Sequence, residues 1–90
     1  MRRLDWALRR EPEFENVDPK TSVAILPTAA IEQHGPHLPT GTDTLIMDGM
    51  LNAFRKQCPE DLDPWILPIQ TVGKSNEHLW AQGTLTLTAR

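Results

Sequence analysis

Residues 21 to 31 read TSVAILPTAAI, and this short run decides the fold class. It contains no charged residue and is rich in β-branched side chains, which is typical of a strand buried on both faces of a parallel sheet. A second apolar run, WILPIQTV at residues 65 to 72, has the same character. We therefore expect two neighbouring strands of one α/β domain.

A helix is predicted between these two runs. Apolar residues recur there at helical spacing; they are Leu45, Ile46, Met50, Leu51 and Phe54. Thr42 or Asp43 is placed to cap the start of the helix, and Cys58-Pro59 ends it. Strand, helix and strand together form a βαβ unit with an expected right-handed crossover.

This unit leaves its strands poorly covered. Parallel sheets need helices on both faces, and one βαβ unit supplies one helix for two strands. We therefore interpret residues 1–90 as a single partial domain, with residues 1–20 as an entry segment, at the start of a larger α/β domain. Obligate assembly with another chain is the alternative way to cover the strands.

Composition excludes several classes of function. The formal net charge of −3 at pH 7 provides no basic patch for nucleic acid. The single cysteine permits no internal disulfide. No apolar run has the length of a signal peptide or a membrane span, so we expect a cytoplasmic protein without membrane contact. A solvated N-terminal segment is expected for the arginines that alternate there with acidic residues, namely Arg2, Arg3, Arg9 and Arg10.

The loop EQHGPHLPTGTD, residues 32 to 43, follows the first strand and is rich in ligand-type side chains. Glu32 and His34 are two residues apart, so they point the same way if the strand continues, and Asp43 returns at the helix start. Such side chains suit zinc, manganese or iron. The alternatives are an N-cap at Asp43, an exposed carboxylate at Glu32, and structural roles for His34 and His37.

The second loop, GKSNEHLWAQGT at residues 73 to 84, follows the second strand. Loops at the carboxyl ends of parallel strands converge, so the two loops are expected side by side. Glu77 and His78 are candidates for acid/base work or for hydrogen-bonding a substrate, with a solvated loop pair as the alternative. Ser75 lacks the glycine-flanked elbow of an activated nucleophile. Trp80 is expected to pack rather than to line a pocket.

Together the two loops resemble segments of the creatininase (creatinine amidohydrolase) family. ILPTAAIEQHGPHLPTGTDTLI, residues 25 to 46, is similar to its N-terminal signature, in which a strand leads into E-Q-H-G-x-H-L-P and a T-D at the next helix. GKSNEHLWAQGTLTL, residues 73 to 87, resembles its G-x-S-x-E-H-x-x-F-P-G-T-x-T-L segment, with Ala81-Gln82 in place of Phe-Pro. The resemblance covers about residues 20 to 88.

The resemblance implies a three-layer α/β/α fold with a mainly parallel sheet and a centre of two divalent metal ions, zinc, manganese or iron. The implied reaction is hydrolysis of a small-molecule, non-peptide and often cyclic amide C–N bond by a metal-activated water. Relatives in the family include a pyrimidine deformylase and a peptidase that matures a redox-cofactor peptide. A homo-oligomer is implied for the full-length form.

Carried over to this sequence, the resemblance gives Glu32 to one metal, His34 to the second, and Asp43 to both as a bridge. The candidate catalytic residues are His37, Glu77 and His78. Three ligands shared between two ions leave each ion with two, below the three expected at a catalytic zinc site. The sequence therefore predicts a truncated, weakly active or inactive form. A non-catalytic metal-binding module and an inactive remnant are the alternatives.

Overall fold

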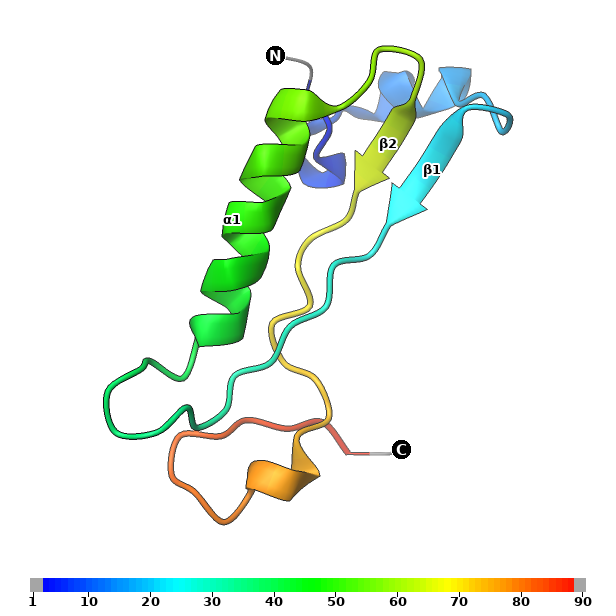
Figure 1. The fold of residues 1–90 in the computed structure, drawn as a ribbon. Helices are drawn as coiled ribbons and strands as arrows, with labels where there is room; N and C mark the ends of the chain where they lie inside the picture. Colours follow the sequence, from blue (N-terminus) through cyan, green and yellow to red (C-terminus); the bar gives the residue numbers. More distant parts are fainter. Residues whose placement is uncertain (1–2, 89–90) are drawn as a thin grey trace.

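A βαβ unit organises the computed structural model of the protein, which describes residues 3–88. Strand β1 (Ser22–Ile25) leads into helix α1 (Thr42–Gln57), which is followed by strand β2 (Asp63–Ile66). The strands pair in parallel, with Ile25 opposite Ile66. Figure 1 shows α1 running alongside the strand pair. The structure confirms the predicted start of an α/β fold.

Both strands are shorter than the sequence predicts. β1 and β2 each span four residues, whereas strands were expected over 21–31 and 65–72. A proline stands two residues past each strand, and proline has no N–H to donate to the ladder. The two segments still run on together, because Thr28 and Gln70 form an isolated parallel bridge. The two segments therefore continue side by side up to the loops, although only this isolated bridge pairs them there.

β1 is also less buried than predicted. Val23 is 47% exposed, and Leu26 just beyond the strand is 56% exposed. Within residues 3–88, no strand pairs with the outer edge of β1. The expectation of a strand buried on both faces is therefore wrong for β1. An open edge with a single covering helix is what an incomplete parallel sheet presents.

Helix α1 starts without a side-chain cap. The predicted caps Thr42 and Asp43 are wrong, because Gly41 occupies the N-cap position. The Thr42 hydroxyl instead donates a hydrogen bond to the Pro39 carbonyl oxygen (2.6 Å). The Asp43 carboxylate is thus left to interact with the loop that precedes the helix. Cys58 follows the last helical residue, as predicted.

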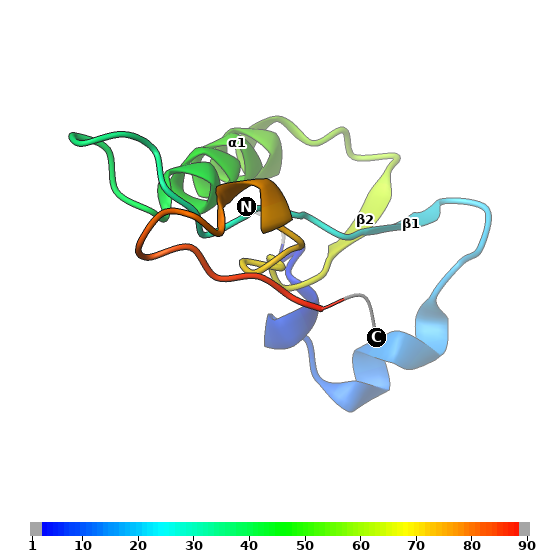
Figure 2. The same cartoon turned by 90° about the horizontal axis from the view of Figure 1, so that it is seen from below.

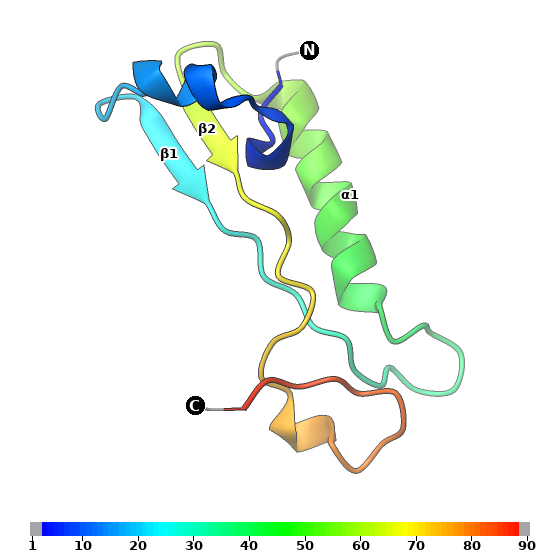
Figure 3. The same cartoon turned by 180° about the vertical axis from the view of Figure 1, so that it is seen from behind.

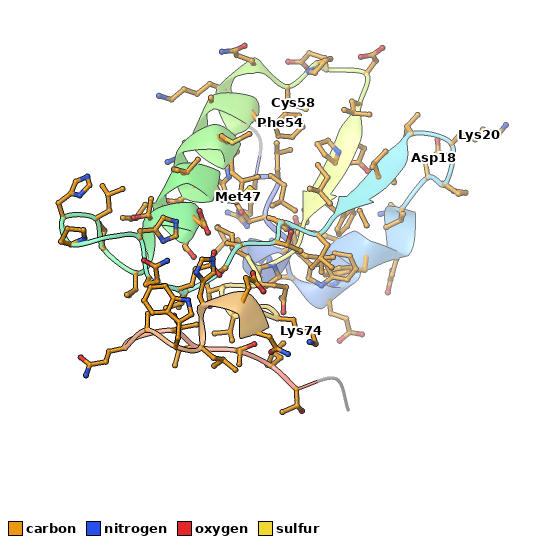
Figure 4. The ribbon with its side chains drawn as sticks, turned by 60° about the horizontal axis from the view of Figure 1, so that its bottom comes forward. Asp18, Lys20, Met47, Phe54, Cys58 and Lys74 are labelled. Atoms are coloured by element: carbon orange, nitrogen blue, oxygen red, sulfur yellow. The ribbon has the colours of Figure 1, made fainter. Side chains whose placement is uncertain are left out.

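A small apolar core lies between α1 and the strands. Its buried members are Leu4, Leu51 and Ile66, and partly buried side chains pack against them, namely Ile25, Met47, Phe54, Cys58 and Ile69. Figure 4 shows Met47, Phe54 and Cys58 on the side of α1 that faces the strands. Other apolar side chains of α1 are more than half exposed, namely Leu45, Ile46 and Met50. No helix within residues 3–88 has the length and apolar character needed to cross a membrane.

The entry segment packs along β2. Leu4 is only 2% exposed, and its carbonyl oxygen accepts a hydrogen bond from the Ile66 amide (2.9 Å). Two short 3₁₀ helices follow, η1 (Trp6–Leu8) and η2 (Glu11–Asn16). They lie on the side of the strands opposite α1, as Figures 2 and 3 show. The strands are therefore covered in part on both faces.

Arg9 departs from the predicted solvated arginine cluster. Its side chain is 9% exposed, and its Nη2 donates to the Pro64 carbonyl oxygen (2.8 Å). Its guanidinium lies 3.6 Å from the centroid of the Trp65 ring. This arginine ties the entry segment to β2, so the prediction is wrong for Arg9. Arg10 stays exposed, and Arg2 lies outside the described residues.

Candidate metal centre

The loops that follow β1 and β2 lie together at one end of the molecule, as predicted (Figure 1). The tail after the 3₁₀ helix η3 (Asn76–His78) joins them. The Leu85 amide donates to the Ile31 carbonyl oxygen (2.8 Å), and the Leu87 amide donates to the Gly73 carbonyl oxygen (2.9 Å). Backbone hydrogen bonds from one tail therefore hold both loops.

Two threonines of the tail fasten the loops further. Thr84 Oγ1 accepts a hydrogen bond from the Gln33 amide (3.2 Å), and Thr86 Oγ1 accepts one from the Ser75 amide (2.7 Å). Sequence reasoning missed these contacts, because alternating threonines also suit helix caps. The only indication of these contacts in the sequence was the position of Thr84 and Thr86 in the GTLTL part of the second loop motif.

Two loop glycines adopt backbone conformations that side chains rarely allow. Gly35 has φ of +78° and Gly83 has φ of +87°. A Cβ on Gly83 would also lie 3.1 Å from the Thr40 Cγ2 methyl. Gly83 therefore allows the second loop to pass close to Thr40 of the first loop.

Glu32, His34 and Asp43 come together at this end of the molecule. One ligand atom from each lies within 4.8 Å of the others, and all three residues are partly buried. The His34 ring joins the group: its Nδ1 is 2.9 Å from the Glu32 backbone oxygen, and its Nε2 is 3.2 Å from Asp43 Oδ1. The structure thus assembles the three predicted metal ligands from the first loop and the start of α1.

Both ring nitrogens of His34 face acceptor oxygens. The Glu32 carbonyl at Nδ1 and the Asp43 carboxylate at Nε2 each suit a donated N–H, so the protonated ring satisfies both contacts. When the neutral ring donates from Nδ1 to Glu32, its lone pair on Nε2 faces Asp43. Metal-binding histidines commonly donate their other N–H to a backbone carbonyl in this way. His34 is therefore prepared to offer Nε2 to a metal ion.

The same contacts raise the pKa of His34 above its ordinary value of 6.5. The largest cause is the hydrogen bond to the Glu32 backbone, and the Asp43 carboxylate adds to it through a hydrogen bond and its charge. Partial burial acts in the opposite direction. Protons therefore compete for the His34 ring over a higher pH range than for a free histidine.

Glu32 also belongs to a second group, with Glu77 and His78 from the second loop. His78 Nε2 lies 3.8 Å from Glu32 Oε1. The other ring nitrogen, Nδ1, lies 3.0 Å from the side-chain nitrogen of Gln33. The structure therefore brings two of the three candidate catalytic residues next to a candidate metal ligand.

The other candidates lie apart from these groups. His37 is exposed in the turn after Gly35 and belongs to neither group. Trp80 is 77% exposed, and its Nε1 donates to the Glu77 backbone oxygen (3.0 Å), so the packing role expected for it is not found within residues 3–88. Ser75 is buried, with 2% exposure.

The donor chemistry of the first group fits a divalent metal. Two carboxylates and an imidazole with a free lone pair suit zinc, manganese or iron. Three residues cannot provide two ions with three protein ligands each. Among residues 3–88, the first group therefore has the donors to hold a metal ion but too few to serve two ions.

Comparisons with known proteins identify one family and several proteins to which this chain is similar. The family model described as creatininase, creatinine amidohydrolase, matches residues 7–90. Two similar proteins are named mycofactocin precursor peptide peptidase, from Mycolicibacterium smegmatis (36% identical over 67 residues) and Mycobacterium tuberculosis strain CDC 1551 (37% over 76 residues). These matches cover 72% and 77% of this chain but 27% and 30% of the relatives. The chain thus spans less than a third of their length. No solved structure matches it.

Proposed function

Because the chain belongs to the creatininase family, we propose that it is part of a metal-dependent amidohydrolase that cleaves an amide C–N bond. One observation carries the proposal: Glu32, His34 and Asp43 converge, with His34 Nε2 3.2 Å from Asp43 Oδ1. The match over residues 7–90 supports the reaction class.

Five of the six predicted site residues have a role in this proposal. Glu32 would hold one ion, His34 would hold the second, and Asp43 would be shared between them. When bound, zinc, manganese or iron ions activate water as a nucleophile and polarise an amide carbonyl. Glu77 is exposed beside Glu32, which suits transfer of a proton toward the leaving nitrogen. The exposed ring of His37 suits contact with a substrate.

The substrate is an amide of one of two classes. The resemblance to the creatininase family implies a small, non-peptide and often cyclic amide, whereas the relatives are named for acting on a precursor peptide. We propose the non-peptide amide first. The test compares hydrolysis of creatinine with hydrolysis of a short peptide by a form of the protein that includes all segments of the family. Cleavage of the peptide alone would overturn the first choice.

The missing ligands are the second part of the proposal. The relatives are long enough to hold further ligand-bearing segments, and we propose that such segments complete both metal sites. The 90-residue chain is then expected to bind metal and to hydrolyse amides slowly or not at all. Cytoplasmic location and assembly into homo-oligomers stay predictions of the same proposal.

The first experiment uses this chain alone. Zn²⁺ or Mn²⁺ is titrated calorimetrically into the metal-free chain and into Asp43→Asn, and amide hydrolysis is measured in the same samples. Binding that Asp43→Asn weakens supports the metal centre, and turnover decides between a weak enzyme and a non-catalytic metal-binding module. A chain that unfolds cooperatively in chelator yet binds no metal would contradict the centre. A chain without any cooperative transition would favour the inactive remnant.

A further inference from the structure

Gln33 stands between two candidate metal ligands in the sequence, yet its side chain contacts the second loop. Its Oε1 accepts a hydrogen bond from the Gly35 amide (3.0 Å), and its Nε2 lies 3.0 Å from His78 Nδ1. Its own backbone amide is held by Thr84 Oγ1. Gln33 is therefore fixed at the backbone and at both ends of its side-chain amide.

These contacts determine the tautomer of His78. A backbone N–H can only donate, so the side-chain atom facing Gly35 must be the oxygen of Gln33. The other end of the amide is then the NH₂ group, which donates to His78 Nδ1. In the neutral ring the proton of His78 consequently resides on Nε2, which is the nitrogen 3.8 Å from Glu32 Oε1.

The surroundings of His78 differ from those of His34. Both ring nitrogens of His34 face acceptor oxygens, the Glu32 carbonyl at Nδ1 and the Asp43 carboxylate at Nε2. His78 accepts at Nδ1 and keeps a proton on Nε2 beside Glu32. A nitrogen that carries a proton cannot ligate a metal, so the group of Glu32, Glu77 and His78 does not offer that nitrogen as a ligand.

We propose that Gln33 is a positioning residue that sets the tautomer of His78, and that His78 in turn orients the Glu32 carboxylate for metal binding. The Nε2–H of His78 is attracted to Oε1 of Glu32, although 3.8 Å is longer than a hydrogen bond. This attraction limits the rotation of the Glu32 carboxylate. Partners of metal ligands act in this way in many metal sites. The metal part of this inference rests on the proposed function, whereas the tautomer does not.

The tautomer is tested on the metal-free 90-residue chain by two-bond ¹H–¹⁵N NMR of its histidines, at a pH where the imidazoles are neutral. The wild type is expected to show His78 protonated at Nε2, and the His34 pattern is recorded as a reference. Gln33→Glu preserves an acceptor for Gly35 but replaces the NH₂ donor by an oxygen, so the His78 proton is expected to move to Nδ1. Gln57→Leu, at the end of α1, is the matched control and should leave both patterns unchanged.

Two spectra would overturn the proposal: a wild-type His78 protonated at Nδ1, or a Gln33→Glu variant whose His78 pattern equals the wild type. Gln33→Leu removes both side-chain contacts and is expected to give a mixture of tautomers. Because Gln33→Leu also risks unfolding, the spectrum of Gln33→Glu decides the test. The thermal transition of Gln33→Glu is recorded beside that of Gln57→Leu.

The effect on metal is measured by Zn²⁺ competition with a chromophoric chelator. Gln33→Glu and Gln33→Leu are expected to bind Zn²⁺ ~10-fold more weakly than wild type, at the lower end of the range for partners of metal ligands. An unchanged affinity with a changed tautomer would overturn the role of His78 in orienting Glu32. If the wild type binds no Zn²⁺, the proposed metal centre and the orienting role both fail, while the NMR result still decides the tautomer.

Discussion

The two ends of the molecule are held together by different interactions. Where the entry segment meets β2, Leu4 and Ile66 are each 2% exposed, and Arg9 stacks on Trp65. At the loop end, backbone and hydroxyl hydrogen bonds connect the segments, and ionisable side chains such as Glu32 remain partly exposed. The comparison teaches that stability and chemistry are separated in this chain. Apolar burial fixes the strands at one end, and the loops carry the ligands at the other.

The largest effect is expected from Leu4→Ala at the packed end. Removing a buried leucine side chain costs about 2–5 kcal/mol of unfolding free energy, a large share of what a domain of this size possesses. Leu8→Ala is the matched control, because Leu8 is 61% exposed, and it should change stability by less than ~0.5 kcal/mol. Urea unfolding measures both, and equal losses would contradict burial of Leu4 as a source of stability at the packed end.

At the loop end, the two histidines of the first loop form a matched pair. His34→Gln is expected to weaken Zn²⁺ binding by at least ~100-fold, since even partners of metal ligands contribute ~10–100-fold. His37→Gln should leave the affinity within a few-fold, because His37 lies outside both groups. Isothermal titration measures both, while urea unfolding should show little loss for either. A comparable loss of affinity in His37→Gln would show that the ligand assignment is wrong.

Arg9→Ala tests whether polar contacts also stabilise the packed end. The variant loses a buried hydrogen bond to the Pro64 oxygen and the stacking on Trp65, which is expected to cost about 1–3 kcal/mol of unfolding free energy. Arg10→Ala removes an equal charge from a side chain that is 85% exposed, so it should cost less than ~0.5 kcal/mol. If the two variants unfold at the same urea concentration, Arg9 contributes by charge alone.

The smallest effect is the pH dependence of the loop end. The pKa of His34 is raised in the folded chain, first by the Glu32 backbone and then by Asp43. A raised pKa means that the protonated ring favours the folded state. This contribution is complete below pH 6.5, the ordinary value, and is lost as pH rises through the folded-state pKa.

Urea unfolding of the metal-free chain should therefore show stability falling with pH over that interval. In Asp43→Asn the fall is expected to be smaller but still present, because the backbone contact to Glu32 remains. An identical pH profile for wild type and Asp43→Asn would exclude Asp43 as a cause of the shift. NMR titration of the His34 ring gives the same comparison directly.

The sequence predicts the loop end well, because chemistry there follows residue type. Glu32, His34 and Asp43 are ligand-type residues in a short loop after a strand, and the order of strands and helix brings that loop to the edge of the sheet. The tautomer of His78 could not be predicted. It depends on which end of the Gln33 amide faces the ring, and the folded loops decide that.

The packed end was predicted less well, because its contacts join distant segments. Arg9 looks like one of several solvated arginines until β2 places Trp65 and Pro64 beside it. The strand lengths were overestimated because apolar character was weighed above the local effect of Pro27 and Pro68. Burial of β1 was overestimated as well, since residues 3–88 supply one α-helix, two short 3₁₀ helices and no further strand to cover it.

The open edge of β1 has a practical consequence for anyone who purifies this chain alone. An unpaired strand edge flanked by exposed apolar side chains is a template for pairing with the same edge of another molecule. Val23 and Leu26 provide such side chains, at 47% and 56% exposure. Sedimentation is therefore expected to show association that grows with protein concentration, and a lysine at position 23 is expected to reduce it. In proteins where a further strand pairs with this edge, the edge is no longer available for pairing with another molecule, and aggregation is expected to be weaker.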